Sequence, residues 1–560
     1  MIRSLFSSVV IIILSGGGGL AHDEIQTAQW EATTKRTLDF IQRNLSIPLP
    51  EWALRIPDYN DGLMNFTVSF LNFLTKERSC SLEGNIFGKN CGMCAHDCTF
   101  LREALGEERL VEDDPEVIIL SPVMAERKRT DPRGDQYLRI RALLALPARP
   151  PGRFYLVQKT CARCLPNERD CTSGRAAEDA TKGNHTLCRL LFRKDFIFAD
   201  VDLGEHDLDD DKIGGLLRGV TLPTGGWTDR HKLRSDVVLD ARYGPTATTP
   251  RHLVWLRGKC HGGVRSKCVQ EPALCTPEQV ANAARNARKV SRVRFSLALA
   301  FNDNRSSSRS SRHGVASSSS SSLSLARDGS DVTSDFGEEA LLEWTSIGGR
   351  SIVECPGIPT FRPPELDNPT PPQLSLPSSL SSSSSSSSDF PRGPHGYVSS
   401  LVVRRYFEKM LDCWFSFCAH GDERWNLRFL ELLSAGTIPV VVADGLTLPF
   451  AQLIPWETIV PVIPEALADT KDPDRILAPL RAIARHSPHS SAPGDDHRMH
   501  HRDDAAAGRR ELLRRSATGL AVFQVYFSNP PARVRGLLAS VGVILRDERA
   551  RLLGPKLGPW

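Results

Sequence analysis

This sequence lacks two things: a charge excess of one sign and a long uninterrupted apolar run. Over 560 residues, 70 basic and 66 acidic side chains leave a formal net charge of +4, without a dense basic block. The chain therefore lacks the electrostatic signature of a nucleic-acid-binding protein. Apolar residues make up 40% and charged residues 24%, an ordinary globular composition with room for two or three domains.

The apolar stretch at the N-terminus is too short and too rich in glycine for a typical membrane span, which needs about 20 apolar residues. Arg3 precedes a short apolar run, and small residues end at Ala21. This arrangement predicts a signal peptide over residues 1–21. A short membrane anchor is the alternative.

Cysteines and glycosylation sequons indicate an oxidising, glycosylating lumen. The chain has 14 cysteines, and Asn-x-Ser/Thr sequons occur at Asn44, Asn65, Asn184 and Asn304. Within a Cys-rich region over 22–192, Cys91-x-x-Cys94 and Cys161-x-x-Cys164 could suggest zinc. The long gap between the pairs favours disulfides, whose connectivity stays open.

Three segments have compositions that bury too little apolar surface to order themselves. Serine and proline dominate 304–325 and 363–392, and five histidines fall between His486 and His501. We expect disordered insertions at 304–325, 363–392 and 486–508. Adventitious metal binding by the histidines is the alternative in the third.

The segment from Trp425 to Ala443 is predicted to form a helix, a tight turn and a buried strand. Leucines recur at helical spacing up to Leu433, and Gly436 stands where that helix would need a left-handed cap. The β-branched run over 438–443 shows no polar alternation, which is typical of a parallel strand covered on both faces. We also expect strands at 196–199, 237–239, 253–256 and 293–301, and helices at 28–45, 66–74, 281–290, 511–520 and about 534–545.

Charged residues crowd both ends of this central unit. The loop from Gly421 to Arg424 leads into the helix, and Arg428 lies near its start. Guanidinium groups at a helix N-terminus favour phosphate. Asp444 closes the strand at its carboxyl end, where open α/β sheets place their ligands. The alternative is a plain core unit with solvated arginines.

The same stretch resembles the C-terminal signature of the exostosin family, glycosyltransferase family 47. Its matching residues are Phe417-Cys418, Gly421-Asp422, Arg428 with Glu431, Gly436 to Val440, Asp444-Gly445, Leu448 to Phe450, and Trp456. Thr437 replaces the family's usual cysteine. Looser matches at Asp236–Val238, Leu253–Gly258 and Tyr526–Ser528 extend the resemblance roughly from Asp236 to Arg549.

The resemblance implies an α/β fold of GT-B type, with two Rossmann-like domains facing a cleft. The Cys-rich region over 22–192 would include the acceptor side, and 193–560 would be exostosin-like. The nucleotide-sugar-binding domain would span about 250–560. Implied too are transfer from a UDP-sugar to a glycan or glycoprotein acceptor with inversion, no obligatory cofactor or metal, and a Golgi lumen or membrane location, with secretion or the cell wall second.

Six residues are candidates for binding the nucleotide sugar: Gly421, Arg424, Arg428, Glu431, Asp444 and Arg257. By resemblance Glu431 should hydrogen-bond the ribose. The alternative is an intrahelical pair with Arg428, one turn earlier.

An acidic loop follows the predicted strand at 196–199. Asp200-x-Asp202 after a strand is how metal-dependent GT-A transferases hold a divalent cation. The pattern is common by chance in acidic surface loops, so a solvated loop is the favoured interpretation and a metal site the alternative. Asp200, Asp202 and Asp207 are candidates for the general base, and none is singled out. Two rival functions stay open: a GT-A transferase using Asp200 and Asp202, and a non-catalytic glycan-binding or cell-wall protein.

Overall fold

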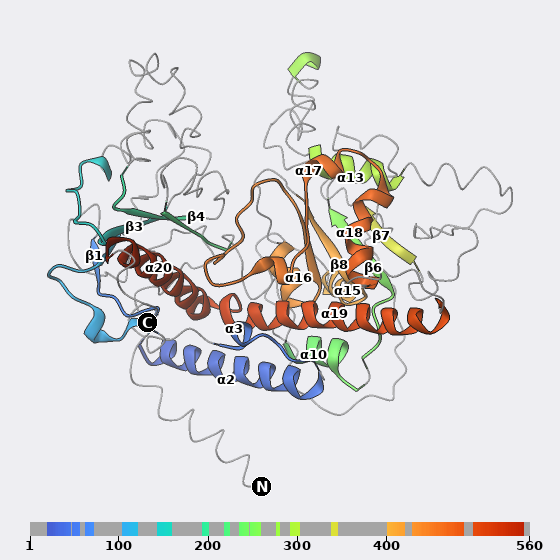
Figure 1. Cartoon of the computed structure of the whole chain (residues 1–560), viewed down its shortest axis with the longest axis horizontal. Helices are drawn as coiled ribbons and strands as arrows, with labels where there is room; N and C mark the ends of the chain where they lie inside the picture. The colour runs from blue at the N-terminus through green and yellow to red at the C-terminus, as the bar shows by residue number, and fades with distance from the viewer. Residues whose placement is uncertain are drawn as a thin grey trace, which may run out of the picture. The chain divides into compact units, whose positions relative to one another are not determined.

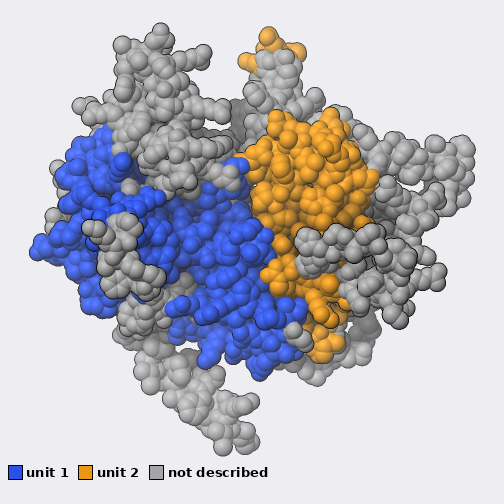
Figure 2. All heavy atoms as spheres, in the orientation of Figure 1, with its two compact units in different colours: residues 1–229, 445–459, 517–560 blue, residues 230–444, 460–516 orange. Residues whose placement is uncertain are grey.

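The computed structural model of this chain is an α/β protein whose described strands form two five-stranded parallel sheets (Figure 1). The chain divides into two compact units (Figure 2): unit 1 comprises 1–229, 445–459 and 517–560, and unit 2 comprises 230–444 and 460–516. The structure describes residues 20–45, 47–55, 62–71, 104–120, 143–158, 193–200, 218–223, 235–245, 247–258, 276–279, 292–302, 338–344, 400–419, 428–485 and 497–553.

The sheet of unit 1 keeps its strands in sequence order. They are β1 (Val68–Leu71), β2 (Val117–Leu120), β3 (Phe154–Gln158), β4 (Phe196–Asp200) and β5 (Arg218–Thr221). Strands β3 and β4, which lie on either side of residue 192, pair with each other, and the first segment of unit 1 runs to Asp229. The helix expected over 66–74 is wrong in its described part, because 68–71 form β1. Short apolar runs of this kind suit a buried strand as well as a helix.

Segments from both ends of the chain pack together in unit 1. The first is α2 (Leu20–Asn44), which confirms the helix expected over 28–45, and the last is α20 (Pro530–Leu553). Trp30 Nε1 donates to the carbonyl of Gln524 at 3.0 Å, near the end of α19 (His497–Tyr526). Unit 1 also holds α3 (Glu51–Leu54) and the short helices η2 (Glu107–Arg109) and η8 (Trp456–Thr458).

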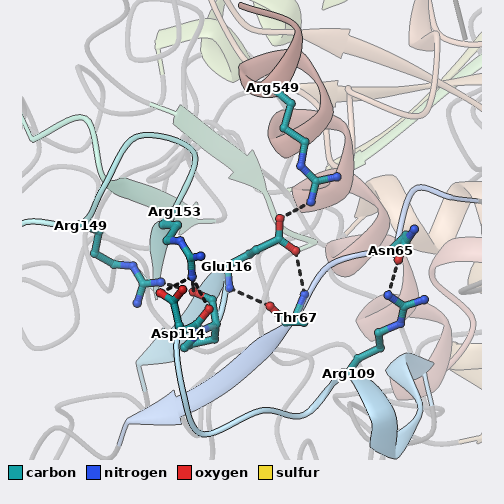
Figure 3. Close-up of polar contacts among 9 residues, drawn as sticks. Asn65, Thr67, Arg109, Asp114, Glu116, Arg149, Arg153 and Arg549 are labelled. Carbon is teal, nitrogen blue, oxygen red and sulfur yellow. Dashed lines mark hydrogen bonds and ion pairs between the residues drawn. The ribbon is translucent and has the colours of Figure 1, made fainter. Parts of the chain in front are cut away.

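Polar contacts tie α20 to the amino edge of this sheet (Figure 3). The backbone N–H of Thr67 donates to Glu116 Oε2 at 3.1 Å, and the N–H of Glu116 donates to Thr67 Oγ1 at 3.0 Å. Arg549 of α20 pairs with Glu116 Oε1. The sequon residue Asn65, which is exposed, accepts a hydrogen bond from Arg109 beside this cluster.

The sheet of unit 2 is wound in two directions. Its strands are β6 (His252–Gly258), β7 (Glu338–Trp344), β8 (Cys413–Ala419), β9 (Ile438–Val442) and β10 (Val462–Ile463), in the order β10-β9-β8-β6-β7. From β6 the chain moves outward to β7 and then returns to the other side of β6 with β8. Doubly wound sheets bind ligands outside the carboxyl ends of the two strands at such a reversal, here after Gly258 and Ala419.

Helices cover both faces of this sheet. One face packs Phe415 and Phe417 of β8 against α13 (Arg292–Asn302), α17 (Glu465–Ala468) and α18 (Pro473–Arg485) in one apolar cluster. Helices α15 (Ser400–Leu411) and α16 (Arg428–Ser434) contact β8 but add nothing to that cluster, so they cover the other face. Burial on both sides explains the continuous apolar run of β9, which confirms the strand expected there.

Two expected strands are helices. Residues 237–239 lie in α10 (Ser235–Tyr243), where Val238, Leu239, Arg242 and Tyr243 are buried and Val237 is 46% exposed. Because the buried residues recur at helical spacing, this segment is a helix despite the preference of its two valines for β-strands. Residues 293–301 lie in α13, which buries Val293, Leu297 and Phe301.

The insertion expected over 486–508 is wrong in its second part, because 497–508 form the start of α19. That helix also includes the one expected over 511–520. The predicted leader over 1–19, Asn184 and Asn304, the insertions 304–325 and 363–392, the helix 281–290 and all cysteines except Cys413 and Cys418 lie outside the described residues. Among the described helices, none combines the length and apolar character needed to cross a bilayer.

Candidate functional site

The turn after α16 has the geometry expected of a left-handed helix cap. Gly436 has φ +63°; its N–H donates to the carbonyl of Leu433 at 3.1 Å, and the N–H of Thr437 donates to that of Leu432 at 2.9 Å. This pair of bonds is the Schellman motif, which needs glycine at the left-handed position. The turn leads directly into β9 and fixes where α16 ends.

A polar triad of Arg428, Glu431 and Tyr406 lies where α15 meets α16. The Tyr406 hydroxyl donates to Glu431 Oε2 at 2.5 Å, and the phenol is also hydrogen-bonded to the Arg428 side chain. Arg428 and Glu431 are partly buried, and Arg428 Nε is fully enclosed. The two residues therefore share Tyr406 as a partner, an arrangement that neither sequence interpretation of Glu431 included.

Burial and charge both act on this triad. Burial disfavours the charged guanidinium, but the neighbouring Tyr406 and Glu431 outweigh it and raise the pKa of Arg428 above its ordinary value. Burial, reinforced by Glu431, raises the pKa of Tyr406. Burial raises the pKa of the nearby Cys418 thiol to about 12. At neutral pH the cation is therefore permanent, while the phenol and the thiol stay protonated.

Thr437, which stands where the family usually has cysteine, joins the ends of α15 and α16. Its hydroxyl donates to the carbonyl of Met410 at 2.6 Å and accepts from Arg242 Nη2 at 2.7 Å. Arg242 also donates to the carbonyls of Met410 and Cys413 at 2.7 and 2.8 Å. A cation suits the carbonyl end of α15. The sequence does not indicate this role of Arg242, because the strand expected over 237–239 would not place Arg242 on a helix beside α15.

Replacing Thr437 by valine should destabilise unit 2 by about 1 to 2 kcal/mol, because the isosteric side chain can neither donate to Met410 nor accept from Arg242. Thr437→Cys should cost less, since a thiol keeps a weak donor. Urea unfolding followed by tryptophan fluorescence measures both. Equal midpoints for Thr437→Val and the unmodified chain would show that these bonds add nothing.

Asp444 is engaged at the carboxyl end of β9. Its N–H donates to Glu465 Oε1 at 3.2 Å, and its Oδ1 accepts from the N–H of Glu465 at 2.9 Å. Arg292 pairs with Glu465 and Asp469 at 3.2 and 3.3 Å. The exposed Asp444 thus fastens the strand end to α17.

The other predicted site residues are placed less fully. Arg257 lies at the end of β6, in register with Glu343, and Asp200 ends β4; their side chains lie outside the described part of the chain, as do Gly421, Arg424, Asp202 and Asp207. Among the described residues, no group of three His, Cys, Asp or Glu side chains could hold a metal ion.

The remaining signature residues form an apolar core in unit 1. The ring of Phe450 stacks on Phe527 with centroids 5.5 Å apart, and Trp456 lies 6.1 Å from Phe527. Trp456 Nε1 donates to the carbonyl of Pro449 at 2.8 Å. These residues build the fold of unit 1, whereas Arg428 and Glu431 belong to unit 2.

In unit 2 a permanent cation and a carboxylate thus lie on α16, which follows β8, one of the two strands at the reversal. Comparison with known proteins matches the same part of the chain. Residues 377–479 match the Exostosin GT47 domain. This exostosin match confirms the resemblance, over a narrower range than Asp236 to Arg549, and it contains the Arg428–Glu431 helix.

Proteins similar to this chain carry the names of plant glycosyltransferases. The chain is 35% identical over 99 residues to the probable beta-1,4-xylosyltransferase IRX10 of Arabidopsis thaliana, covering 17% of this chain and 24% of that protein. It is 34% identical over 99 residues to the probable glucuronosyltransferase GUT1 of Oryza sativa subsp. japonica, covering 17% and 23%. The similarity thus spans about a quarter of the relatives' length.

Proposed function

We propose that this chain is a glycosyltransferase that moves a sugar from a UDP-sugar to a glycan or glycoprotein acceptor with inversion. The observation that carries the proposal is the Arg428–Glu431 pair at the start of α16, within the exostosin match and next to the strand reversal between β6 and β8. The relatives' names support the reaction class. The fold proposed is GT-B, with the two sheet-bearing units as its halves.

Arg428 would neutralise the charge that develops on the departing UDP. A fixed cation aimed at a leaving diphosphate stabilises the transition state without an obligatory metal ion. Arg424, the Gly421 loop and Arg257 are further candidates for the same task. Glu431 would accept a hydrogen bond from the ribose, while the general base, with Asp200, Asp202 and Asp207 as candidates, would come from unit 1.

The proposed location is the secretory pathway, with the Golgi lumen or membrane first. The predicted leader, the cysteines and the sequons support it. The exposed Asn65 is then an accessible glycosylation site.

The test is hydrolysis of UDP-glucuronate, UDP-galactose, UDP-xylose and UDP-glucose by the purified lumenal region, with and without EDTA. We expect slow hydrolysis of one donor that persists in EDTA. Loss of hydrolysis in EDTA would support the GT-A rival at Asp200, at the end of β4. Absence of both hydrolysis and UDP binding would favour a non-catalytic glycan-binding protein.

A further inference from the structure

Within the described part of unit 2, Tyr406 contacts both members of the proposed donor pair. Its hydroxyl donates to Glu431 Oε2, and its side chain is hydrogen-bonded to Arg428. Tyr406 comes from α15, whereas the pair comes from α16. The phenol therefore couples the two helices through the groups proposed to meet the nucleotide.

The ring of Tyr406 is fixed by its packing. It lies 5.4 Å from the ring of Trp255, tilted by 60°, and 5.5 Å from that of Phe407. Trp255 is fully buried in β6, one of the two strands at the reversal. Aromatic neighbours at these distances favour one ring orientation, so the hydroxyl has a defined position before any ligand arrives.

Freely rotating glutamate and arginine side chains lose conformational entropy when they bind a ligand. A partner that already holds both side chains removes part of that cost and fixes their direction. We propose that Tyr406 is a positioning residue of the donor site, orienting the Glu431 carboxylate toward the ribose and the Arg428 guanidinium toward the diphosphate. This inference rests on the proposed function.

The test variant is Tyr406→Phe, which keeps the packed ring and deletes only the hydroxyl. Tyr243→Phe is the matched control, because Tyr243 is a buried tyrosine of the same unit whose hydroxyl bonds Ser516 Oγ at 2.7 Å. Calorimetry measures the affinity of each variant for UDP and for 2′,3′-dideoxy-UDP. We expect Tyr406→Phe to lower the preference for UDP over the dideoxy nucleotide about tenfold, the effect of one hydrogen bond to a charged group. Tyr243→Phe should leave that preference unchanged.

A double-mutant comparison shows whether Tyr406 acts through Glu431. In the Glu431→Gln background, Tyr406→Phe should have little further effect on the preference, because residues that act as one unit are not additive. An unchanged preference in Tyr406→Phe, or full additivity with Glu431→Gln, would overturn the positioning role. The donor site itself would still be upheld if the unmodified chain bound UDP and Arg428→Ala lost that binding. Absence of UDP binding by the unmodified chain would refute the donor site itself.

Discussion

Arg428→Ala is expected to weaken UDP binding about 100-fold, because the role proposed for Arg428 is to make charge-assisted hydrogen bonds to the diphosphate. The Arg428 guanidinium is enclosed at Nε and hydrogen-bonded to Tyr406. Water that enters after the substitution would therefore not restore a fixed positive charge at this position. Isothermal calorimetry with UDP measures the loss directly.

Two further variants define the cause. Arg428→Lys keeps the charge and loses the planar fork, so it should cost about tenfold. Arg251→Ala should leave the affinity unchanged: Arg251 is an exposed arginine of the same unit that pairs with Asp412 next to the amino end of β6, opposite the proposed site. Equal UDP affinity in Arg428→Ala and the unmodified chain would remove Arg428 from the site.

Gly436→Val should destabilise unit 2 by about 3 kcal/mol. The left-handed conformation costs an L-residue about 1 to 2 kcal/mol, and it is least compatible with a β-branched side chain. A Cβ here would also lie 2.9 Å from the hydroxyl of Tyr243, which is itself buried and hydrogen-bonded. Urea unfolding of both proteins gives the difference.

Gly436→Asn separates backbone strain from crowding. Asparagine tolerates the left-handed region better than other non-glycine residues, so it should cost clearly less than valine while meeting the same Tyr243 hydroxyl. If the two variants were equally destabilised, crowding alone would explain the loss. If neither were destabilised, the Schellman turn would not limit stability.

The elements predicted best from the sequence were those with a local physical signature. Gly436 marked the end of a helix, the uninterrupted run over 438–443 marked a strand buried on both faces, and 253–256 marked β6. Short apolar runs were ambiguous, because apolar content alone does not distinguish the periodicity of a helix from that of a strand. The valines at 237–238 and the run from Phe66 were assigned wrongly for that reason, and β pairing or helical burial settled each of them.

The candidate site was only half predictable. Arg428 and Glu431 are three residues apart on one helix, a spacing visible in sequence. Tyr406 comes from α15, which precedes β8 in the chain, whereas Glu431 lies on α16 after that strand. Nothing in the sequence around Tyr406 indicates that its hydroxyl meets Glu431. Arg242 likewise reaches Thr437 across 195 residues. Such contacts arise from sheet order, which sequence patterns do not encode directly.

The central claim is that UDP binds at the carboxyl edge of the unit 2 sheet, beside α16. Hydrogen exchange with and without saturating UDP, in buffer containing Mg²⁺, tests it most directly. We predict slower exchange in peptides covering 413–436 and no change in those covering 196–211. Protection over 196–211, with none over 413–436, would contradict the account and place the nucleotide at the acidic loop after β4.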